Sequence, residues 1–102
     1  MAGGAAAALR LLGLARRAGK LFVGAGPVLR ALEHEKAGVV FIANDAGRDV
    51  RRKIERSLGE SVLNDAAFAG EELATLCSRE KVSVVSVHER DFVKGIRDAL
   101  AD

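Results

Sequence analysis

The chain has 102 residues, of which 49% are hydrophobic, so residues 1–102 are predicted to form a single folded domain and disorder is excluded. With four Phe and neither Trp nor Tyr, it is not expected to form an aromatic platform that stacks single-stranded bases. The net charge is +2, but 11 Lys/Arg face 5 Asp/Glu in the first 56 residues, against 5 and 9 in the remainder. This asymmetry fits either a basic face for a polyanion or charges scattered over a solvated surface.

Cysteine usage and hydropathy indicate the compartment. Cys77 is the only cysteine, so an intramolecular disulfide and a Cys-pair metal site are both excluded, which suits the reducing cytoplasm. No apolar run approaches the ~20 residues that span a bilayer, so no membrane partner is expected. The stretch from Met1 to Ala8 lacks a basic leader, and we interpret it as the frayed start of the first helix or an artificial remnant, not as an export signal.

Helical and extended segments are predicted to alternate along the chain. Apolar residues recur at helical spacing from Ala8 to Ala18, and Gly19 ends this first helix. Strands are predicted at 21–23, 39–43, 61–63 and 82–87, and further helices at 27–36, 48–58, 70–79 and 91–100. Such alternation predicts an α/β fold, a three-layer α/β/α sandwich with a small, largely parallel or mixed four-stranded sheet.

The first strand is connected to the second helix by Gly24-Ala25-Gly26-Pro27. Glycine lets the backbone approach a ligand closely, and Pro27 suits the first position of a helix. The free N–H groups of the helix start can bind an anion, and Lys20 and Arg30 are expected to flank them with positive charge. The connection therefore predicts a phosphate-bearing partner, with a plain tight turn as the alternative. It lacks the third glycine of a dinucleotide motif and the Gly-Lys-Ser/Thr ending of a nucleoside triphosphate loop.

A polar pair, Asn44 and Asp45, follows the apolar strand 39–43. These side chains could bond a ligand or cap the next helix, and capping is the expected role of at least one of them. Ligands in open α/β sheets gather beyond the carboxyl ends of the strands. The polar pair and the glycine connection are therefore the two segments expected to form a site.

The helix predicted at 48–58 is strongly basic. Val50 and Ile54 occupy its core-facing positions, so the charged residues fan across its exposed side. The basic residues are Arg48, Arg51, Arg52, Lys53 and Arg56. Arginine suits bidentate contact with phosphate, and the alternative is a solvated face in which Asp49 and Glu55 are partial partners.

No motif in the chain indicates catalysis. His34, His88 and the single cysteine do not have the spacing of metal ligands, and no nucleophile motif accompanies them. We therefore predict a non-enzymatic protein without a metal or a cofactor.

Taken together, these segments resemble the kink-turn RNA-binding ribosomal protein superfamily of the L7Ae/L30e type, and most closely its bacterial YlxQ-like branch. The resemblance runs from about Leu11 to Leu100. It rests on Leu12-Gly13-Leu14-Ala15-Arg16-Arg17-Ala18-Gly19-Lys20, Gly24 with Val28-Leu29-Arg30-Ala31, Ile42-Ala43-Asn44-Asp45-Ala46, Glu72-Leu73, Val84-Val85 and Phe92. It implies an α/β/α fold that binds structured RNA, often at a kinked internal loop.

The resemblance also implies roles for individual residues. The amides of the first loop, with Lys20 and Arg30, would hold phosphates, and Asn44 and Asp45 would contact base edges or ribose hydroxyls. An apolar loop at 67–69 is added to the site, in which Phe68 would pack against an exposed base. Arg48 and Arg52 would extend the electrostatic contact. The full set of expected RNA-binding residues is Lys20, Gly24, Ala25, Gly26, Arg30, Asn44, Asp45, Arg48, Arg52 and Phe68.

One departure from the family pattern bears on specificity. The first loop of kink-turn binders carries Gly-x-Asn-Glu, whereas this chain has Gly26 and Pro27 there. Two base-edge contacts, each worth ~1–3 kcal/mol, would be lost. The leading hypothesis is a cytoplasmic, monomeric protein that recognises structured RNA through loops at one end of the sheet, with kink-turn RNA and ribosomal RNA as candidate partners. The alternatives are a protein-interaction module that kept the fold and lost specific RNA recognition, and a small nucleotide-binding domain.

Overall fold

The structure is a computed structural model that describes residues 2–101, and for residues 2 and 3 the backbone alone. Helices and strands alternate in it as the sequence predicts. In chain order they are α1 (Ala2–Arg17), β1 (Leu21–Val23), α2 (Ala25–His34), β2 (Val39–Ile42), α3 (Arg48–Ser57), β3 (Val62–Asn64), α4 (Gly70–Leu76), β4 (Val84–Val87) and α5 (Arg90–Ala101). Of the stretch interpreted above as a frayed helix start or a remnant, residues 2–8 form the first turns of α1, with Ala8 buried in the core, and Met1 lies outside the described residues.

The four strands form one mixed sheet in the order β1-β4-β2-β3. β4 is antiparallel to both of its neighbours, β1 and β2, while β2 and β3 are parallel. Three strands therefore run in one direction and β4 runs in the other. β1, β2 and β3 finish at one end of the sheet, where β4 starts, and we call this end the exit end. We call the opposite end of the sheet the entry end.

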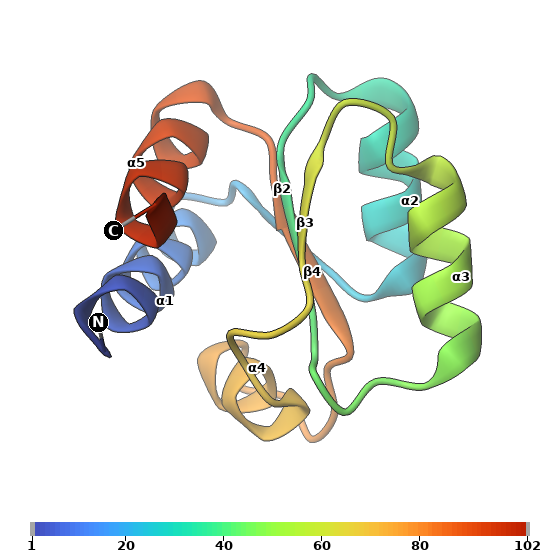
Figure 1. Ribbon diagram of the computed structural model, residues 1–102, viewed down its shortest axis with the longest axis horizontal. Coiled ribbons are helices and arrows are strands. Elements are labelled where there is room, and N and C mark those ends of the chain that lie inside the picture. The colour runs from blue at the N-terminus through green and yellow to red at the C-terminus, as the bar shows by residue number, and fades with distance from the viewer. Residues whose placement is uncertain (1, 102) are drawn as a thin grey trace.

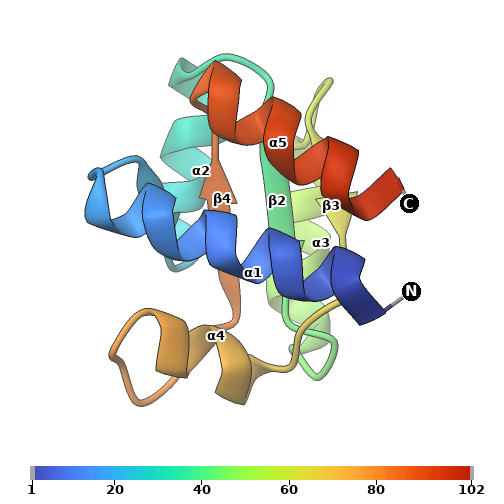
Figure 2. The same cartoon turned by 90° about the vertical axis from the view of Figure 1, so that its left-hand side faces the viewer.

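Helices cover both faces of the sheet, which confirms the predicted α/β/α sandwich. α2 and α3 lie on one face, and α1 and α5 lie together on the other, with α4 at the exit end on the α1 side (Figures 1 and 2). Every residue of β2 and β4 is buried because these central strands are covered on both faces. None of the helices within residues 2–101 is long and apolar enough to cross a membrane.

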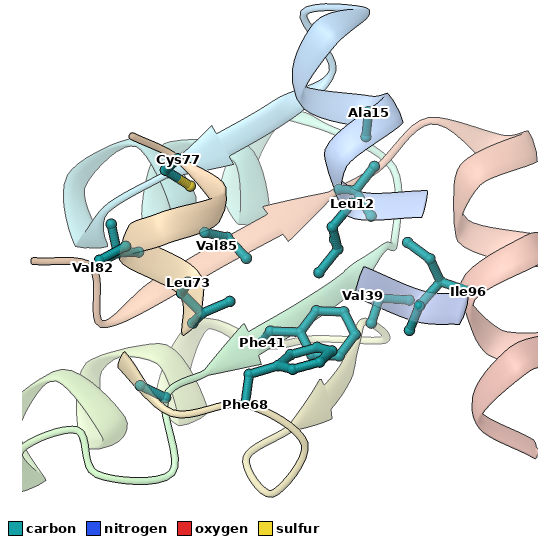
Figure 3. Close-up of a cluster of buried hydrophobic side chains, with 14 residues drawn as sticks. Leu12, Ala15, Val39, Phe41, Phe68, Leu73, Cys77, Val82, Val85 and Ile96 are labelled. Atoms are coloured by element: carbon teal, nitrogen blue, oxygen red, sulfur yellow. The ribbon is translucent and has the colours of Figure 1, made fainter. Parts of the chain in front are cut away.

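The core consists of two apolar clusters, one on each side of the sheet. The larger joins the sheet to α1, α4 and α5 and includes Leu12, Phe41, Leu73 and Ile96 (Figure 3). The smaller joins the sheet to α2 and α3 through Val28, Val40, Ile42, Ile54 and Val84. Together they hold the helices at fixed positions relative to the strand ends.

The start of α2 differs from the sequence prediction. The helix begins at Ala25, so Pro27 occupies its third position and not the first. Gly24 makes this possible because its φ of 96° turns the chain directly from β1 into α2, a conformation that is strained for other residues. Pro27 remains in the first turn, where its missing N–H has no cost.

Other boundaries shift by up to three residues. α4 ends at Leu76 and not at Arg79, because Ser78 takes a φ of 53° that no helix can continue through. β4 begins at Val84 instead of Val82, and β3 spans 62–64 instead of 61–63.

Candidate nucleic-acid interface

The two connections expected to form a site lie together at the exit end of the sheet (Figure 1). The N–H of Gly24 donates to the carbonyl of Val84 at 2.9 Å, which anchors the start of α2 to the start of β4. The N–H of Asn44 donates to the carbonyl of Phe68 at 2.8 Å, which joins the β2–α3 connection to the β3–α4 connection. Because β1, β2 and β3 run in the same direction, three loops that are distant in sequence lie together at the exit end.

The start of α2 is an open helix N-terminus. Its N-cap residue is Gly24, and no side chain caps it. Arg30 folds back along the helix, since a Cβ added to Gly26 would lie 3.5 Å from the Nη1 atom of Arg30. The N–H groups of Ala25 and Gly26 and the guanidinium of Arg30 are therefore close together, an arrangement that suits an anion.

The start of α3 repeats this pattern. Its N-cap is Gly47, again without a side-chain cap. Three exposed arginines, Arg48, Arg52 and Arg56, follow at intervals of four residues, so they form one stripe along the helix. Buried Ile54 lies on the opposite side of α3 from this stripe. In the part of the chain that the structure describes, no carboxylate forms an ion pair with these three arginines.

The neighbouring Arg51 has a different environment. Its side chain is partly buried and forms an ion pair with Asp65, which follows β3. This pair ties the first turns of α3 to the β3–α4 connection. Among the arginines of α3, those of the stripe are exposed and available to a ligand, whereas Arg51 is paired with Asp65.

The two residues of the polar pair after β2 also have different environments. The Oδ1 atom of Asp45 accepts a hydrogen bond of 2.9 Å from the N–H of Gly70, the first residue of α4. One member of the pair therefore has a capping role, but at α4. The next helix, α3, has Gly47 as its N-cap and no side-chain cap, so the expectation that the pair caps the next helix is wrong. The side chain of Asn44 is exposed and has no hydrogen-bond partner among residues 2–101, so it can bond a ligand.

Lys20 does not lie where the sequence suggested. Leu21, the residue after it, pairs with Val87 at the end of β4, which places Lys20 at the entry end. The length of β1, ~10 Å at ~3.3 Å per residue, separates it from the start of α2. The expectation that Lys20 flanks the α2 start together with Arg30 is therefore wrong.

Phe68 also has a different role from the one that the resemblance implied. Its side chain is 3% exposed, and its ring centroid lies 5.3 Å from that of Phe41 (Figure 3). A ring buried in the core cannot stack on a base. Phe68 contributes to the interface only by packing beneath it and by accepting the hydrogen bond from Asn44.

A fourth connection, between α4 and β4, lies at the exit end and was missed by the sequence analysis. With the β2–α3 connection it lines a groove of about 440 Å³, to which it contributes Arg79, Glu80, Lys81, Val82 and Ser83. Asp45 and Glu71 line the same groove. The basic residues at 79 and 81 were the only signal in the sequence. Their position at the exit end follows only from the direction of β4, which begins at this end of the sheet.

The described residues contain no cluster of three or more His, Cys, Asp or Glu side chains that could hold a metal ion. Cys77 is buried against the larger core cluster. Burial raises the pKa of its thiol, and the nearby Arg16 and Arg79 oppose this effect only in part. A protonated thiol inside the core is a packing group and a poor nucleophile.

Three comparisons with known proteins bear on the family and the fold. The model of the ribosomal protein L7Ae/L30e/S12e/Gadd45 family matches residues 6–96. A protein described as the RNA-binding protein YlxQ of Enterococcus faecium is 44% identical over 48 residues, which are 47% of this chain and 47% of that relative. The match thus spans about half of the relative's length.

A solved structure from Bacillus halodurans, described as a protein with unknown function, superimposes with a TM-score of 0.80 at 23% identity. The superposition covers 93% of this chain and 97% of that one, which shows that the fold is shared. Because the family model covers nearly the whole sequence and the fold agrees, the chain belongs to the ribosomal protein L7Ae/L30e/S12e/Gadd45 family.

Proposed function

We propose that the protein is a single, non-enzymatic RNA-binding domain that holds structured RNA at the exit end of its sheet. Family membership and the similarity to an RNA-binding protein support RNA as the partner. One observation carries the proposal. The N-termini of α2 and α3 both lack a side-chain cap and lie at the exit end of the sheet, and an exposed arginine lies beside each.

In this proposal the two helix starts grip the phosphate backbone. The amides of Ala25 and Gly26 and the guanidinium of Arg30 hold one phosphate group, and the stripe of Arg48, Arg52 and Arg56 follows the backbone from there. The stripe spans ~12 Å, because eight residues of helix rise by ~1.5 Å each. Contacts of this kind recognise the shape of an RNA helix and depend strongly on salt.

Fewer groups contact the bases than contact the phosphates in this proposal. Asn44 offers both a donor and an acceptor to a base edge or a ribose hydroxyl, and the Oδ2 atom of Asp45 adds a further acceptor. Gly26 and Pro27 supply no side-chain polar group, so we propose an RNA helix interrupted by an internal loop as the ligand, without a strict need for a kink turn. Ribosomal RNA in the cytoplasm is the first natural candidate, and we propose that the protein binds it as a monomer.

The experiment measures filter binding of a hairpin RNA with an asymmetric internal loop over a series of salt concentrations. The variant Arg30→Gln/Arg48→Gln removes one cation from each helix start. We expect it to weaken binding at low salt by at least about ten-fold and to lower the slope of log K against log salt by about 1.5.

The control is Arg10→Gln/Arg16→Gln, which removes the same charge from exposed positions on α1 and leaves the starts of α2 and α3 unchanged. Equal losses in the two variants would mean that only net charge matters, and our placement of the site would be wrong. Comparison of a kink-turn hairpin with one whose sheared pairs are replaced by Watson–Crick pairs tests specificity. We expect the two affinities to lie within about three-fold of each other, because Gly26 and Pro27 supply no polar side chain to the sheared pairs. A lost base contact worth ~1.4 kcal/mol would instead change the affinity ten-fold.

A second candidate, a protein-interaction module, is favoured by one apolar surface. Leu14 on α1 is 49% exposed and borders a groove that Leu9 and Leu76 also line. Absence of salt-dependent binding to any hairpin probe would favour this candidate over RNA binding.

A further inference from the structure

The displaced Lys20 belongs to a second group of cations, at the entry end of the sheet. Two adjoining cavities of about 480 and 490 Å³ lie there, and they share Lys36, His88 and Arg90 in their walls. They bring together the end of α1, the α2–β2 connection and the start of α5. We call their basic residues, Lys20, Lys36, Arg90, Lys94 and Arg97, the entry-end surface.

The acidic residues in the same cavities offset only part of this charge. Glu89 accepts hydrogen bonds through Oε1 from the N–H groups of Asp91 at 3.0 Å and Phe92 at 3.1 Å, so its carboxylate caps α5. Asp98 forms an ion pair of 2.8 Å with Lys94. Over both cavities, five basic side chains face three carboxylates, those of Glu35, Glu89 and Asp98. The residues that line the cavities therefore carry a net charge of about +2.

The backbone beneath these cations is firmly held. His88 is buried, and its Nδ1 atom donates to the carbonyl of Lys36 at 2.8 Å while Nε2 hydrogen-bonds the Oγ atom of Ser86 at 2.9 Å. Phe22 packs edge-on against the imidazole, with ring centroids 5.6 Å apart. The segments that carry Lys36 and Arg90 are thus fixed to one another, which lowers the entropy lost when a ligand binds.

The entry-end surface and the helix starts of the proposed RNA site lie at opposite ends of the sheet in a molecule whose extents are 30 × 27 × 24 Å. The arginine stripe runs along α3 from the exit end toward the entry end, so Arg56 is nearer the entry end than Arg48 is. The two surfaces also lie on different layers, since the arginine stripe is on α3 and the entry-end surface includes α5, on the other face of the sheet (Figures 1 and 2).

We infer that the entry-end surface binds the phosphate backbone of a second RNA segment, so that one copy of the protein bridges two RNA helices. The inference rests on the proposed function, because it assigns a second contact to the same class of ligand. The chemistry favours RNA over a protein partner. The apolar wall residues of the cavity beside α5 are Ala37, Val93 and Ala101, which are small for the anchors that protein interfaces use. Phe22, in the wall of the adjoining cavity, is already packed edge-on against His88.

The test uses two hairpin RNAs with internal loops, one with a donor fluorophore and one with an acceptor, mixed with the full chain at low salt. We expect protein-dependent energy transfer, and native mass spectrometry should show one protein with two RNAs. The variant Lys36→Gln/Arg90→Gln removes the two cations shared by both cavities. It should keep its affinity for a single hairpin within about two- to three-fold and weaken the two-RNA complex at least about ten-fold.

The control Arg10→Gln/Arg16→Gln loses equal charge on α1 and should form the two-RNA complex as the parent does. Energy transfer equal to that of the parent in Lys36→Gln/Arg90→Gln would overturn the inference. Single-hairpin binding without any two-RNA complex would overturn it and leave the proposed function intact. Absence of single-hairpin binding by the parent would overturn both. Displacement of the second hairpin by poly-glutamate at equal concentration would assign the surface to an acidic protein instead.

Discussion

Phe68 and Asp45 both follow strands at the exit end, yet their side chains meet different surroundings. Phe68 points into the core against Phe41, and the carboxylate of Asp45 is exposed and bonds Gly70. The resemblance to the family implied an RNA contact for each. The contacts that decide between a ligand role and a structural role come from segments more than 20 residues away, and one sequence carries no signal for them.

A substitution at Phe68 tests the corrected role. Phe68→Ala removes a buried ring and leaves a cavity beside Phe41, so we expect the free energy of unfolding to fall by ~3–5 kcal/mol. Urea unfolding followed by circular dichroism measures this loss. Phe68→Leu keeps most of the apolar volume and should cost less than half as much.

RNA affinity separates this role from base stacking. The folded fraction of Phe68→Leu should bind the internal-loop hairpin as tightly as the parent, because no ring is withdrawn from the RNA. A loss of stability under 1 kcal/mol in Phe68→Ala, together with weaker binding by Phe68→Leu, would contradict a core role.

At the scale of elements, the positions of helices and strands were predictable, but the direction of β4 was not. Hydrophobic periodicity identifies a strand and is silent on which way it runs. The direction follows from α4, whose seven residues span only ~10 Å and lie at the exit end (Figure 2). The chain therefore leaves α4 still at this end, and β4 must run back antiparallel. This brings Lys81 to the site.

Within α3, two adjacent arginines are expected to behave differently. Arg52→Gln removes a cation from the free stripe, so RNA binding should weaken several-fold and the salt slope should fall by about 1, with no change in stability. Arg51→Gln breaks the ion pair with Asp65. It should lower the free energy of unfolding by up to ~1 kcal/mol and affect RNA affinity less than Arg52→Gln does.

Each variant is the control of the other, since both make the same chemical change one residue apart on one helix. Filter binding over a salt series and urea unfolding provide the two measurements. Equal effects of Arg51→Gln and Arg52→Gln on RNA affinity would show that the stripe is not a distinct contact surface.

At the scale of the whole molecule, the charge asymmetry along the sequence does not become a single basic face. β1, α2 and β2 each cross between the two ends, so the basic first half contributes Arg30 and Arg48 to the exit end but Lys20 and Lys36 to the entry end. The acidic second half adds Arg90 to the entry end. A linear count of charge was compatible with a basic face for a polyanion and with scattered charges, and the division into two surfaces depends on the topology.

Binding to either surface stabilises the folded chain, because the unfolded chain lacks the arranged contacts. At an RNA concentration one hundred times Kd, the gain in the free energy of unfolding is ~2.7 kcal/mol. With m-values of ~1–3 kcal/mol/M, this moves the urea midpoint up by roughly 1–2.5 M. Pulse proteolysis measures the midpoint without interference from RNA absorbance, which matters because the chain has neither Trp nor Tyr as a fluorophore.

Salt makes this prediction specific to phosphate contacts. The shift should disappear as salt rises, because counterion release drives the binding, while the midpoint of the free protein should move far less. The variant Arg30→Gln/Arg48→Gln should lose most of the shift at low salt, and Arg10→Gln/Arg16→Gln should keep it. A shift that persists unchanged at high salt would mean that the RNA is held by apolar or base contacts, in which case the two open helix starts are not what grips it.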